Sequence, residues 1–120
     1  MAFVKACALS DIPDVGAIGV EIDGVPVAVV RSDGEVYAIY NVCSHEEVEL
    51  SDGDVEDCEI ECWLHGSRFD LRNGEPTGLP ATEPVPVFGC SVDGEDVLVD
   101  VHTTMNDVTA PELERAKGAS

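Results

Sequence analysis

The sequence predicts a small all-β domain, and two observations carry this prediction. Short runs rich in Val, Ile and Tyr recur at intervals of about eight to twelve residues, a spacing typical of sandwiches and barrels. Asp-Gly pairs, which favour two-residue hairpin turns, stand between several of these runs. The chain has 120 residues, which is enough for one domain with its own core and too few for two.

The first predicted strands follow one another as hairpins. Residues 20–23, 25–31 and 35–40 are strand-like runs of mainly apolar residues. Asp23-Gly24 and Asp33-Gly34 stand at the two connections between them. We therefore expect three consecutive antiparallel strands joined by tight turns.

The middle of the chain alternates polar loops with short strands. Residues 43–54 are polar and rich in turn formers. Residues 55–61 then alternate apolar and charged side chains, which indicates one strand with Cys58, Ile60 and Cys62 on the same face. This strand would deliver a second loop that begins at Cys62.

A further short strand over residues 67–71 is expected to leave this second loop, and Asn73-Gly74 would close its hairpin. The stretch Glu75–Val87 contains four prolines. Because proline lacks a backbone N–H donor, we interpret this stretch as a rigid extended connection and not as a strand in mid-sheet.

The last predicted hairpin joins residues 86–92 to residues 96–101 through Asp93-Gly94. Residues 103–120 have a different character. Pro111, near the start of a possible helix, and Gly118, after its end, permit one or two helical turns, and a frayed tail is the alternative.

Two short Cys/His pairs are the strongest functional signal. Cys43 and His45 are separated by one residue, Cys62 and His65 by two, and sixteen residues lie between the pairs. In an extended loop, residues i and i+2 point the same way, so each pair can face one centre. Two thiolates and two imidazoles on two loops suit a [2Fe-2S] cluster in which thiolates hold one iron and histidines hold the other.

A zinc site is the alternative for these four residues, because tetrahedral zinc also takes Cys and His ligands. The one-residue spacing of the first pair is tighter than usual for zinc, and the order Cys, His, Cys, His is atypical. We therefore favour the iron–sulfur cluster. Because only neutral imidazole can ligate a metal, we also expect the redox state of the cluster to be coupled to histidine protonation.

The other three cysteines, Cys7, Cys58 and Cys90, are interpreted as small buried hydrophobic residues. Their odd number fits a reducing compartment. No long apolar run is present at the start or elsewhere, so we expect a cytoplasmic protein with no membrane partner.

Charge narrows the range of partners. The chain has 25 acidic and 6 basic residues, which gives a formal net charge of −19. Nucleic acids and anionic membranes would repel such a surface, whereas a basic patch on a redox partner would attract it. Solubility or adaptation to a salty cytoplasm would explain the same charge.

These motifs resemble bacterial Rieske-type ferredoxins, and the likeness extends from Phe3 to about Val101. It implies the Rieske fold, with three antiparallel sheets, over residues 1–102, and a small cluster-binding subdomain over about residues 42–84. Residues 103–120 would form the tail. Residues 60–67 are especially similar to actinobacterial members whose genes lie beside iron–sulfur assembly genes.

Four further residues are expected near the cluster. Gly66 would allow the backbone to approach it closely, with amide groups directed at sulfur. Trp63, between two ligands, would shield the cluster, contact a partner or pack against its own loop. The family resemblance places Ser67 where a hydroxyl can donate to cluster sulfur and Pro80 in a third loop that covers the cluster.

The resemblance also bears on the reduction potential. Val48 and Leu64 occupy the positions at which respiratory Rieske proteins carry a second pair of cysteines, so no disulfide can join the two loops here. Hydrogen bonds to cluster sulfur raise the potential and nearby acidic charge lowers it. We expect a potential in the lower third of the range from roughly −150 to +300 mV, and a lower one still after Ser67→Gly.

Function follows from the motifs that are present and from those that are missing. The sequence contains no nucleotide fingerprint, no Ser/His/Asp set and no mononuclear iron site, so we expect an electron carrier and not an enzyme. The resemblance implies transfer from a flavin-dependent reductase to a terminal oxygenase, by docking through basic patches on the partners. The alternatives are an accessory or sensor protein in cluster assembly and a nitrite reductase small subunit.

Overall fold

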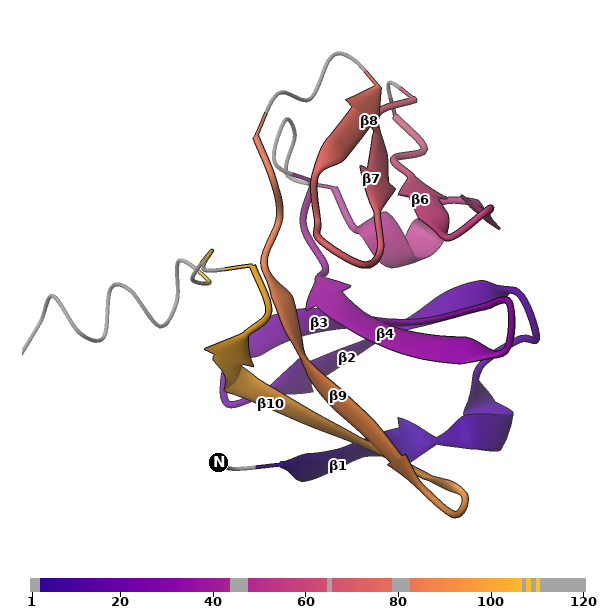
Figure 1. The fold of residues 1–120 in the computed structure, drawn as a ribbon, viewed down its shortest axis with the longest axis vertical. Helices are drawn as coiled ribbons and strands as arrows, with labels where there is room; N and C mark the ends of the chain where they lie inside the picture. The colour runs from indigo at the N-terminus through magenta and orange to yellow at the C-terminus, as the bar shows by residue number, and fades with distance from the viewer. Residues whose placement is uncertain are drawn as a thin grey trace, which may run out of the picture.

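The computed structural model describes residues 3–43, 48–64, 66–78, 83–106, 108 and 110. Within these residues the chain forms β-strands and two single-turn 3-10 helices, neither of which could cross a membrane (Figure 1). The elements are β1 Val4–Ala8, η1 Leu9–Asp11, β2 Gly16–Ile22, β3 Val25–Ser32, β4 Glu35–Tyr40, η2 Leu50–Asp52, β5 Val55–Glu56, β6 Glu59–Glu61, β7 Arg68–Asp70, β8 Pro76–Gly78, β9 Val87–Asp93 and β10 Asp96–Thr104.

Six strands form one antiparallel sheet, in the order β1-β10-β9-β4-β3-β2. Its two halves are joined only by the short β4–β9 ladder, in which Ala38 pairs with Phe88 and Ile39 with Val87. The sheet folds at this ladder, so that β1-β10-β9 lies beneath β2-β3-β4 (Figure 1). We call these six strands the base.

An apolar core fills the space between the two halves of the base. Its fully or nearly fully buried members come from every strand of the six. They are Cys7, Ile12, Ile22, Val25, Val27, Val29, Ala38, Phe88, Val97, Val99, Val101 and Ala110.

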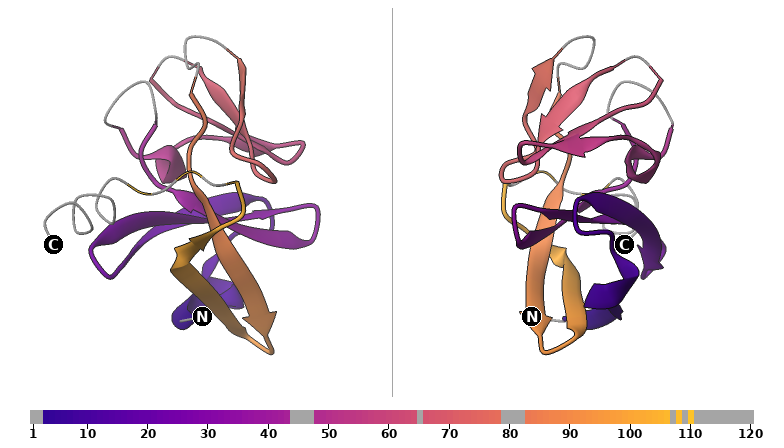
Figure 2. Two further views of the ribbon diagram at one scale, coloured as in Figure 1. Left: turned by 60° about the vertical axis from the view of Figure 1, so that its left-hand side comes forward. Right: turned by 90° about the vertical axis from the view of Figure 1, so that its right-hand side faces the viewer.

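The other four strands form a small antiparallel sheet in the order β5-β6-β7-β8, which we call the cluster subdomain. It sits at one end of the molecule, over the β3–β4 hairpin (Figures 1 and 2). A second apolar core joins the two, and it includes Val30, Ile39, Leu50, Ile60 and Phe69. Strand β3 is therefore buried on both faces, as the middle layer of three.

The predicted all-β fold with a small subdomain sheet is confirmed. Two of the three expected sheets are continuous with each other, because the β4–β9 ladder links them into one. The boundaries expected at residues 42, 84 and 102 stay predictions.

The hairpins of the base are also confirmed. Asp23 and Asp33 have φ angles of 51° and 52°, and each is followed by a glycine with φ of 80°. Two consecutive residues with positive φ are the hallmark of the type I′ turn, which matches the twist of the paired strands.

The single strand expected over residues 55–61 is wrong. The chain reverses at Asp57-Cys58, with φ angles of 53° and 61°, and forms the β5–β6 hairpin. Cys58 occupies the position that glycine holds in the other two turns, so the turn carries no Asp-Gly signal. Cys58 and Ile60 nonetheless share one buried core with Cys62.

Other differences are smaller. Strand β1 was not predicted, and β2 begins at Gly16, four residues before the expected start. The proline-rich stretch contains one short strand, β8, at the edge of the small sheet, where proline costs no ladder hydrogen bond. Strand β10 runs to Thr104, and the possible C-terminal helix lies outside the described residues.

Candidate metal centre

Cys43 lies at the point where the chain leaves the base. It follows β4 closely and is 4% exposed. Its backbone N–H donates to the carbonyl of Val48 over 3.1 Å, and Val42 pairs with Glu49 just outside that contact. The loop between residues 43 and 48 is thus closed at its base, and His45 within it lies outside the described residues.

Cys62 begins the second loop, directly after β6, and is 1% exposed. Its N–H donates to the carbonyl of Ser67 over 2.6 Å, and the N–H of Gly66 donates back to the carbonyl of Cys62 over 2.9 Å. Gly66 has φ of 77°, which any other residue would adopt only with strain. These bonds close the β6–β7 loop, in which His65 is outside the described residues.

The structure brings the two cysteines into one apolar core, together with Leu50, Ile60 and Phe69. A thiolate in such surroundings is costly unless a cation pairs with it. Two buried sulfurs presented by two closed loops are therefore well suited to a soft metal centre, which deprotonates and neutralises them. The two buried cysteines therefore fit the thiolate ligands of an iron–sulfur cluster.

The remaining expected neighbours of the cluster differ in exposure. Ser67 is completely buried behind the second loop. Trp63 and Leu64, in contrast, are 55% and 40% exposed. Two large apolar side chains therefore stand in solvent between Cys62 and His65. Pro80 lies outside the described residues.

Three acidic residues lie at the start of the second loop, next to Cys62 in the sequence or packed against the residue before it. Asp52, Asp54 and Glu61 lie close together because Gly53 packs directly against the backbone of Glu61, and the N–H of Glu61 donates to the carbonyl of Asp54 over 2.8 Å. Asp52 and Asp54 are exposed. The loops are thus flanked by negative charge.

Two arginines in this region pair with carboxylates. Arg68 lies 3.0 Å from Glu59, and Arg72 lies 3.0 Å from Asp70. The hydrogen bonds from Arg72 hold the pKa of Asp70 below its ordinary value. Neither arginine therefore offers a free positive charge to a ligand.

The other three cysteines are free thiols. Burial is the main cause that raises the pKa of Cys7, with Asp11 adding to it, and burial raises the pKa of Cys90 to about 11. Cys58 hydrogen-bonds with the hydroxyl of Tyr37, and this contact is the main reason that the pKa of Tyr37 rises to about 12. Cys7 and Cys58 are buried, as predicted, and Cys90 is partly buried.

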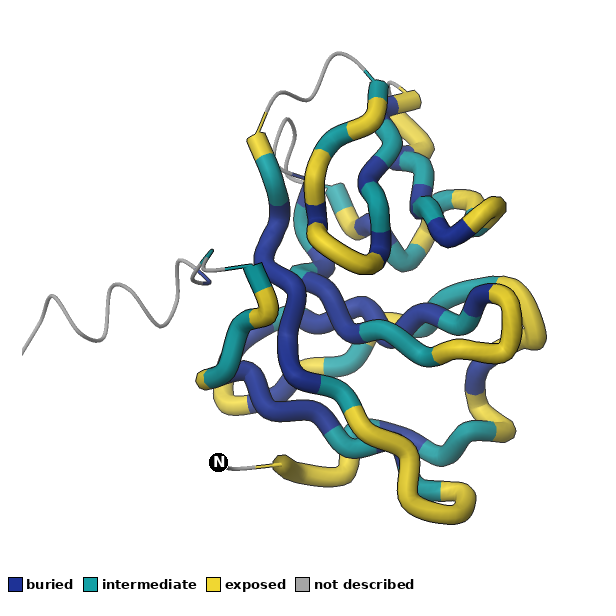
Figure 3. The backbone as a smooth tube through the Cα atoms, viewed as in Figure 1, coloured by how far each residue is buried: buried dark blue, intermediate teal, exposed yellow. Residues whose placement is uncertain are grey.

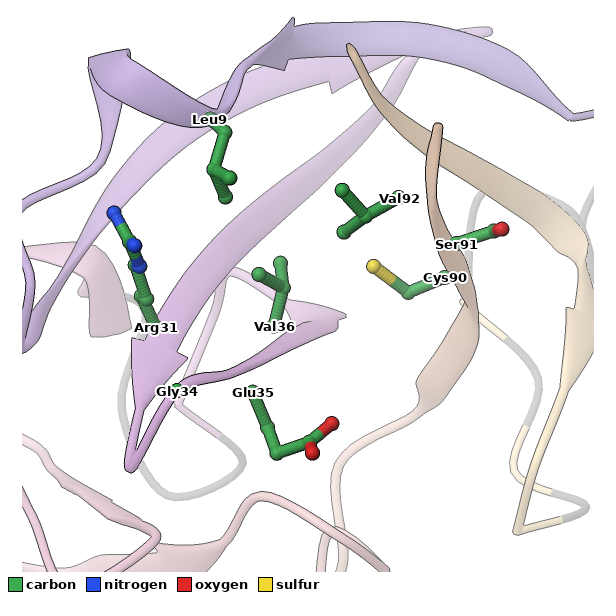
Figure 4. A pocket seen from close by; sticks show the side chains of 8 residues that line it. All are labelled: Leu9, Arg31, Gly34, Glu35, Val36, Cys90, Ser91 and Val92. Carbon is green, nitrogen blue, oxygen red and sulfur yellow. The ribbon is translucent and has the colours of Figure 1, made fainter. Parts of the chain in front are cut away.

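An open hollow of about 330 Å³ lies elsewhere on the molecule, between the β3–β4 turn and β9 (Figure 4). Its lining is Leu9, Arg31, Gly34, Glu35, Val36, Cys90, Ser91 and Val92. The sulfur of Cys90 points toward Val36, and Arg31 lies on the opposite side of the hollow (Figure 4). Neither Cys43 nor Cys62 lines it, so the hollow is separate from the metal centre.

Comparison with known proteins identifies the family of the chain. A model of the Rieske [2Fe-2S] domain family matches residues 2–89. The biphenyl dioxygenase ferredoxin subunit of Pseudomonas sp. (strain KKS102) is 39% identical over 83% of this chain and 93% of its own length. The chain belongs to the Rieske [2Fe-2S] family, whose cofactor is a Rieske-type cluster.

Two solved structures place the chain within that family. The ferredoxin of carbazole 1,9a-dioxygenase from Nocardioides aromaticivorans IC177 is 40% identical, with a TM-score of 0.78 over 82% of this chain and 97% of its own. A ferredoxin in complex with the oxygenase of carbazole 1,9a-dioxygenase is 35% identical, with a TM-score of 0.75 over 81% and 91%. The chain is a ferredoxin component of the aromatic ring-hydroxylating dioxygenase type, an electron carrier and not the oxygenase itself.

Proposed function

We propose that Cys43, His45, Cys62 and His65 hold the Rieske cluster, with the thiolates on one iron and the imidazoles on the other. The observation that carries this proposal is the burial of the two cysteines, in one apolar core, at the start of two closed loops. Each loop contains one of the histidines. The bound cluster supplies one-electron redox chemistry, which no side chain of the protein can supply.

The protein's own residues have separate tasks in this proposal. The apolar core around Cys43 and Cys62 keeps water from the thiolates. Gly66 and Ser67 fix the second loop through backbone hydrogen bonds. To bind iron, His45 and His65 must be neutral, with no proton on the ligating nitrogen. The other ring nitrogen of each histidine carries a proton, which can be lost to solvent as the charge of the site changes.

Substitution of each ligand tests the assignment. Changing Cys43, Cys62, His45 or His65 singly to Ala should abolish the electron paramagnetic resonance signal of a reduced Rieske centre, whose average g value lies below that of an all-cysteine [2Fe-2S] cluster. Changing Cys7 or Cys90 to Ala should leave that signal intact and serves as the matched control. A signal that survives loss of one of the four ligands would contradict the assignment.

We further propose that Trp63 and Leu64 form the centre of the docking surface for redox partners. Both are exposed, and both lie between the proposed ligands Cys62 and His65. Exposed aromatic residues surrounded by charge are typical of the residues that dominate protein interfaces. A partner for this surface needs an apolar hollow ringed by Lys or Arg, to match Asp52, Asp54 and Glu61.

The terminal oxygenase of a ring-hydroxylating system is the proposed acceptor, and a flavin-dependent reductase is the proposed donor. The complex of a related ferredoxin with its oxygenase supports the first of these. The final substrate would be an aromatic or other apolar compound. A cytoplasmic location fits the free thiols of the protein.

Partner docking can be tested with two variants matched in character. Trp63→Ala should lower the second-order rate constant for electron transfer to the oxygenase by about tenfold, which corresponds to a hot-spot loss of about 1.4 kcal/mol. Val92→Ala removes an apolar side chain of similar exposure, 44%, that lies on β9 and not on the loops, and should leave the rate unchanged. Equal effects of the two would count against the surface.

The same surface predicts a salt effect. Because a net charge of −19 favours long-range attraction to a basic partner, the rate constant should fall steeply as NaCl is raised from about 50 to about 300 mM. Stopped-flow mixing of reduced ferredoxin with oxygenase measures this directly. A rate constant that is independent of salt would show that charge does not guide the encounter.

A further inference from the structure

The chain passes between the base and the cluster subdomain at two places. It leaves the base after β4, at residues 41–43, and returns through residues 83–87 to β9. The returning segment is buried from Val85 onward and continues into the buried half of β9 (Figure 3). The position of the subdomain on the base depends on what holds these two crossings.

An asparagine holds the first crossing. Asn41 is 2% exposed, and its side-chain oxygen accepts a hydrogen bond from the N–H of Ser51 over 2.7 Å. Its backbone carbonyl accepts from the N–H of Leu50 over 3.3 Å, and its own N–H donates to Pro26 over 3.0 Å. Asn41 therefore ties β3 and the start of the first cluster loop to η2.

A second asparagine, Asn106, holds the return crossing, although it lies in the segment after β10. Its Nδ2 group donates to the carbonyls of Asn73 and Val85, each over 2.8 Å. Its Oδ1 atom accepts from the N–H groups of Val87 and Val108, over 3.1 and 3.4 Å. An amide has two donors and one oxygen with two acceptor sites, so every hydrogen-bonding site of this side chain is used.

These contacts join segments that are far apart in the sequence. The N–H of Met105 donates to the carbonyl of Val87 over 2.7 Å, which sets Asn106 beside the returning segment. Gly74 packs closely against both Asn106 and the returning segment. A Cβ at this position would lie 2.7 Å from Asn106 Nδ2 and 2.1 Å from the carbonyl oxygen of Val85. The N–H of Val85 in turn donates to the carbonyl of Gly74 over 3.0 Å.

The turn at Asn73 and Gly74 belongs to the strand that leaves the second ligand loop. Strand β7 runs from Arg68 to Asp70, and its far end is fixed to this turn by the bond from Gly74 N–H to the carbonyl of Asp70 over 2.7 Å. The first residue of β7 follows Ser67, whose backbone carbonyl accepts the hydrogen bond from the N–H of Cys62. The strand β7 and the hydrogen bonds at its two ends thus connect Asn106 to the loop that begins at Cys62.

We propose that Asn106 is a positioning residue for the iron–sulfur centre, whose side-chain amide fixes the return crossing and, through β7, the second ligand loop. This inference rests on the proposed ligation by Cys62 and His65. It adds a residue outside residues 2–89, the part of the chain that matches the Rieske family. Asn106 and the end of β10 before it thus belong to the redox unit.

Asn106→Ala and Asn73→Ala form a matched pair for the test. Asn106→Ala removes all four side-chain hydrogen bonds of Asn106. The second removes only a local bond from Glu75 N–H to Asn73 Oδ1, over 2.9 Å, and keeps the backbone carbonyl that Asn106 contacts. Both variants replace an asparagine by alanine, and the two side chains serve the same turn.

In Asn106→Ala we expect chelator-driven loss of the cluster to be about fivefold faster, the factor for one net hydrogen bond of about 1 kcal/mol. We also expect an upward shift of the midpoint potential, because water that enters at the loosened crossing stabilises the more negative reduced state. Asn73→Ala should change neither quantity. An Asn106→Ala protein with the wild-type potential and wild-type cluster loss would overturn the proposal, and so would an equal change in Asn73→Ala.

Amide hydrogen exchange separates this inference from the ligand assignment. Asn106→Ala should reduce protection at Val85 and Gly74, in protein with or without the cluster, and unchanged protection would contradict the positioning role. A wild-type protein that lacks the Rieske signal would instead contradict the ligand assignment, while the exchange result still decides the role of Asn106.

Discussion

At the scale of the residue, the contact between Tyr37 and Cys58 joins the two parts of the molecule. Tyr37 is on β4 of the base, and Cys58 is in the β5–β6 turn of the cluster subdomain. The N–H of Cys58 also donates to Ser32 Oγ over 3.2 Å, at the end of β3. Cys58 therefore serves as a structural contact at this interface, and its thiol is engaged by a tyrosine.

This contact predicts a dependence of stability on alkaline pH. The pKa of Tyr37 is raised to about 12 in the folded protein, above its ordinary value of 10.0, mainly through the hydrogen bond with Cys58. A raised pKa means that the contribution to stability is complete below pH 10 and is lost as the pH rises toward 12. Wild-type protein should thus lose stability across this window more steeply than Tyr37→Phe.

Thermal unfolding of both proteins between pH 9 and about 12 measures the difference. Cys58→Ala, which keeps the tyrosine and removes its thiol partner, is the second variant and should show the same shallow dependence on pH as Tyr37→Phe. Parallel curves for wild type and Tyr37→Phe would show that the tyrosine hydroxyl gains nothing from Cys58.

At the scale of the element, the cluster subdomain is held in place by close backbone packing as well as by its core. A Cβ at Gly53 would lie 1.7 Å from the carbonyl oxygen of Glu61, at the end of β6. Because Cys62 follows Glu61 directly, this contact fixes the strand that presents a proposed ligand. Only glycine allows the segment after η2 to lie so close to β6.

Gly53→Ala should therefore destabilise the folded protein by about 2 to 3 kcal/mol, as overpacking of a tight site does, and lower the cluster content of purified protein. Gly78→Ala is the matched control, because the nearest atom to a Cβ there is 3.9 Å away and β8 has ordinary strand geometry. Denaturant unfolding and iron analysis of the two variants provide the measurement. If both variants retain wild-type iron content, the packing at Gly53 does not govern the site.

The sequence predicts elements only where the signal is local. The hairpins at Asp23-Gly24 and Asp33-Gly34 are predicted because two adjacent residues define the turn. The hairpin at Asp57-Cys58 escapes prediction because cysteine rarely adopts φ of 61°, and tertiary contacts with Tyr37 and Ser32 accompany that conformation. At this turn the local signal and the observed structure differ where long-range contacts intervene.

The site follows the same rule. Cys43, His45, Cys62 and His65 stand out because their chemistry is rare and each pair lies within four residues. Asn106 gives no such signal, since three of its four partners are backbone groups 19 to 33 residues away in the sequence, at Val87, Val85 and Asn73. A hydrogen bond to a backbone group does not require a particular residue type at the partner position, so the sequence does not reveal it.

At the scale of the whole molecule, the proposed metal centre belongs to the cluster subdomain at one end, and the chain as a whole is strongly negative. The molecule measures 37 × 33 × 19 Å, and the cluster subdomain forms one end of it (Figure 2). A thin carrier with its redox centre at the tip brings that centre close to a partner, which keeps the distance for electron transfer short. The net charge of −19 then affects both the rate of encounter with a redox partner and the reduction potential of the cluster.

Charge and hydrogen bonding have opposite effects on the cluster. Acidic side chains around the loops, such as Asp52, Asp54 and Glu61, disfavour the added electron, whereas a hydroxyl donor at buried Ser67 would favour it. Because Val48 and Leu64 replace the cysteines of respiratory Rieske proteins, no disulfide constrains the loops. From these features together we predict a potential near the low end for a Rieske centre.

The most direct test of the central claim, a ferredoxin-type Rieske carrier, is voltammetry of anaerobically purified protein from about pH 6 to about pH 10. We predict a single one-electron wave in the lower third of the range from roughly −150 to +300 mV, which falls with pH once the histidines deprotonate and falls further in Ser67→Gly. A potential above the middle of that range would contradict the account of the site's charge. The absence of any wave, with zinc found in the metal analysis, would contradict electron transfer itself.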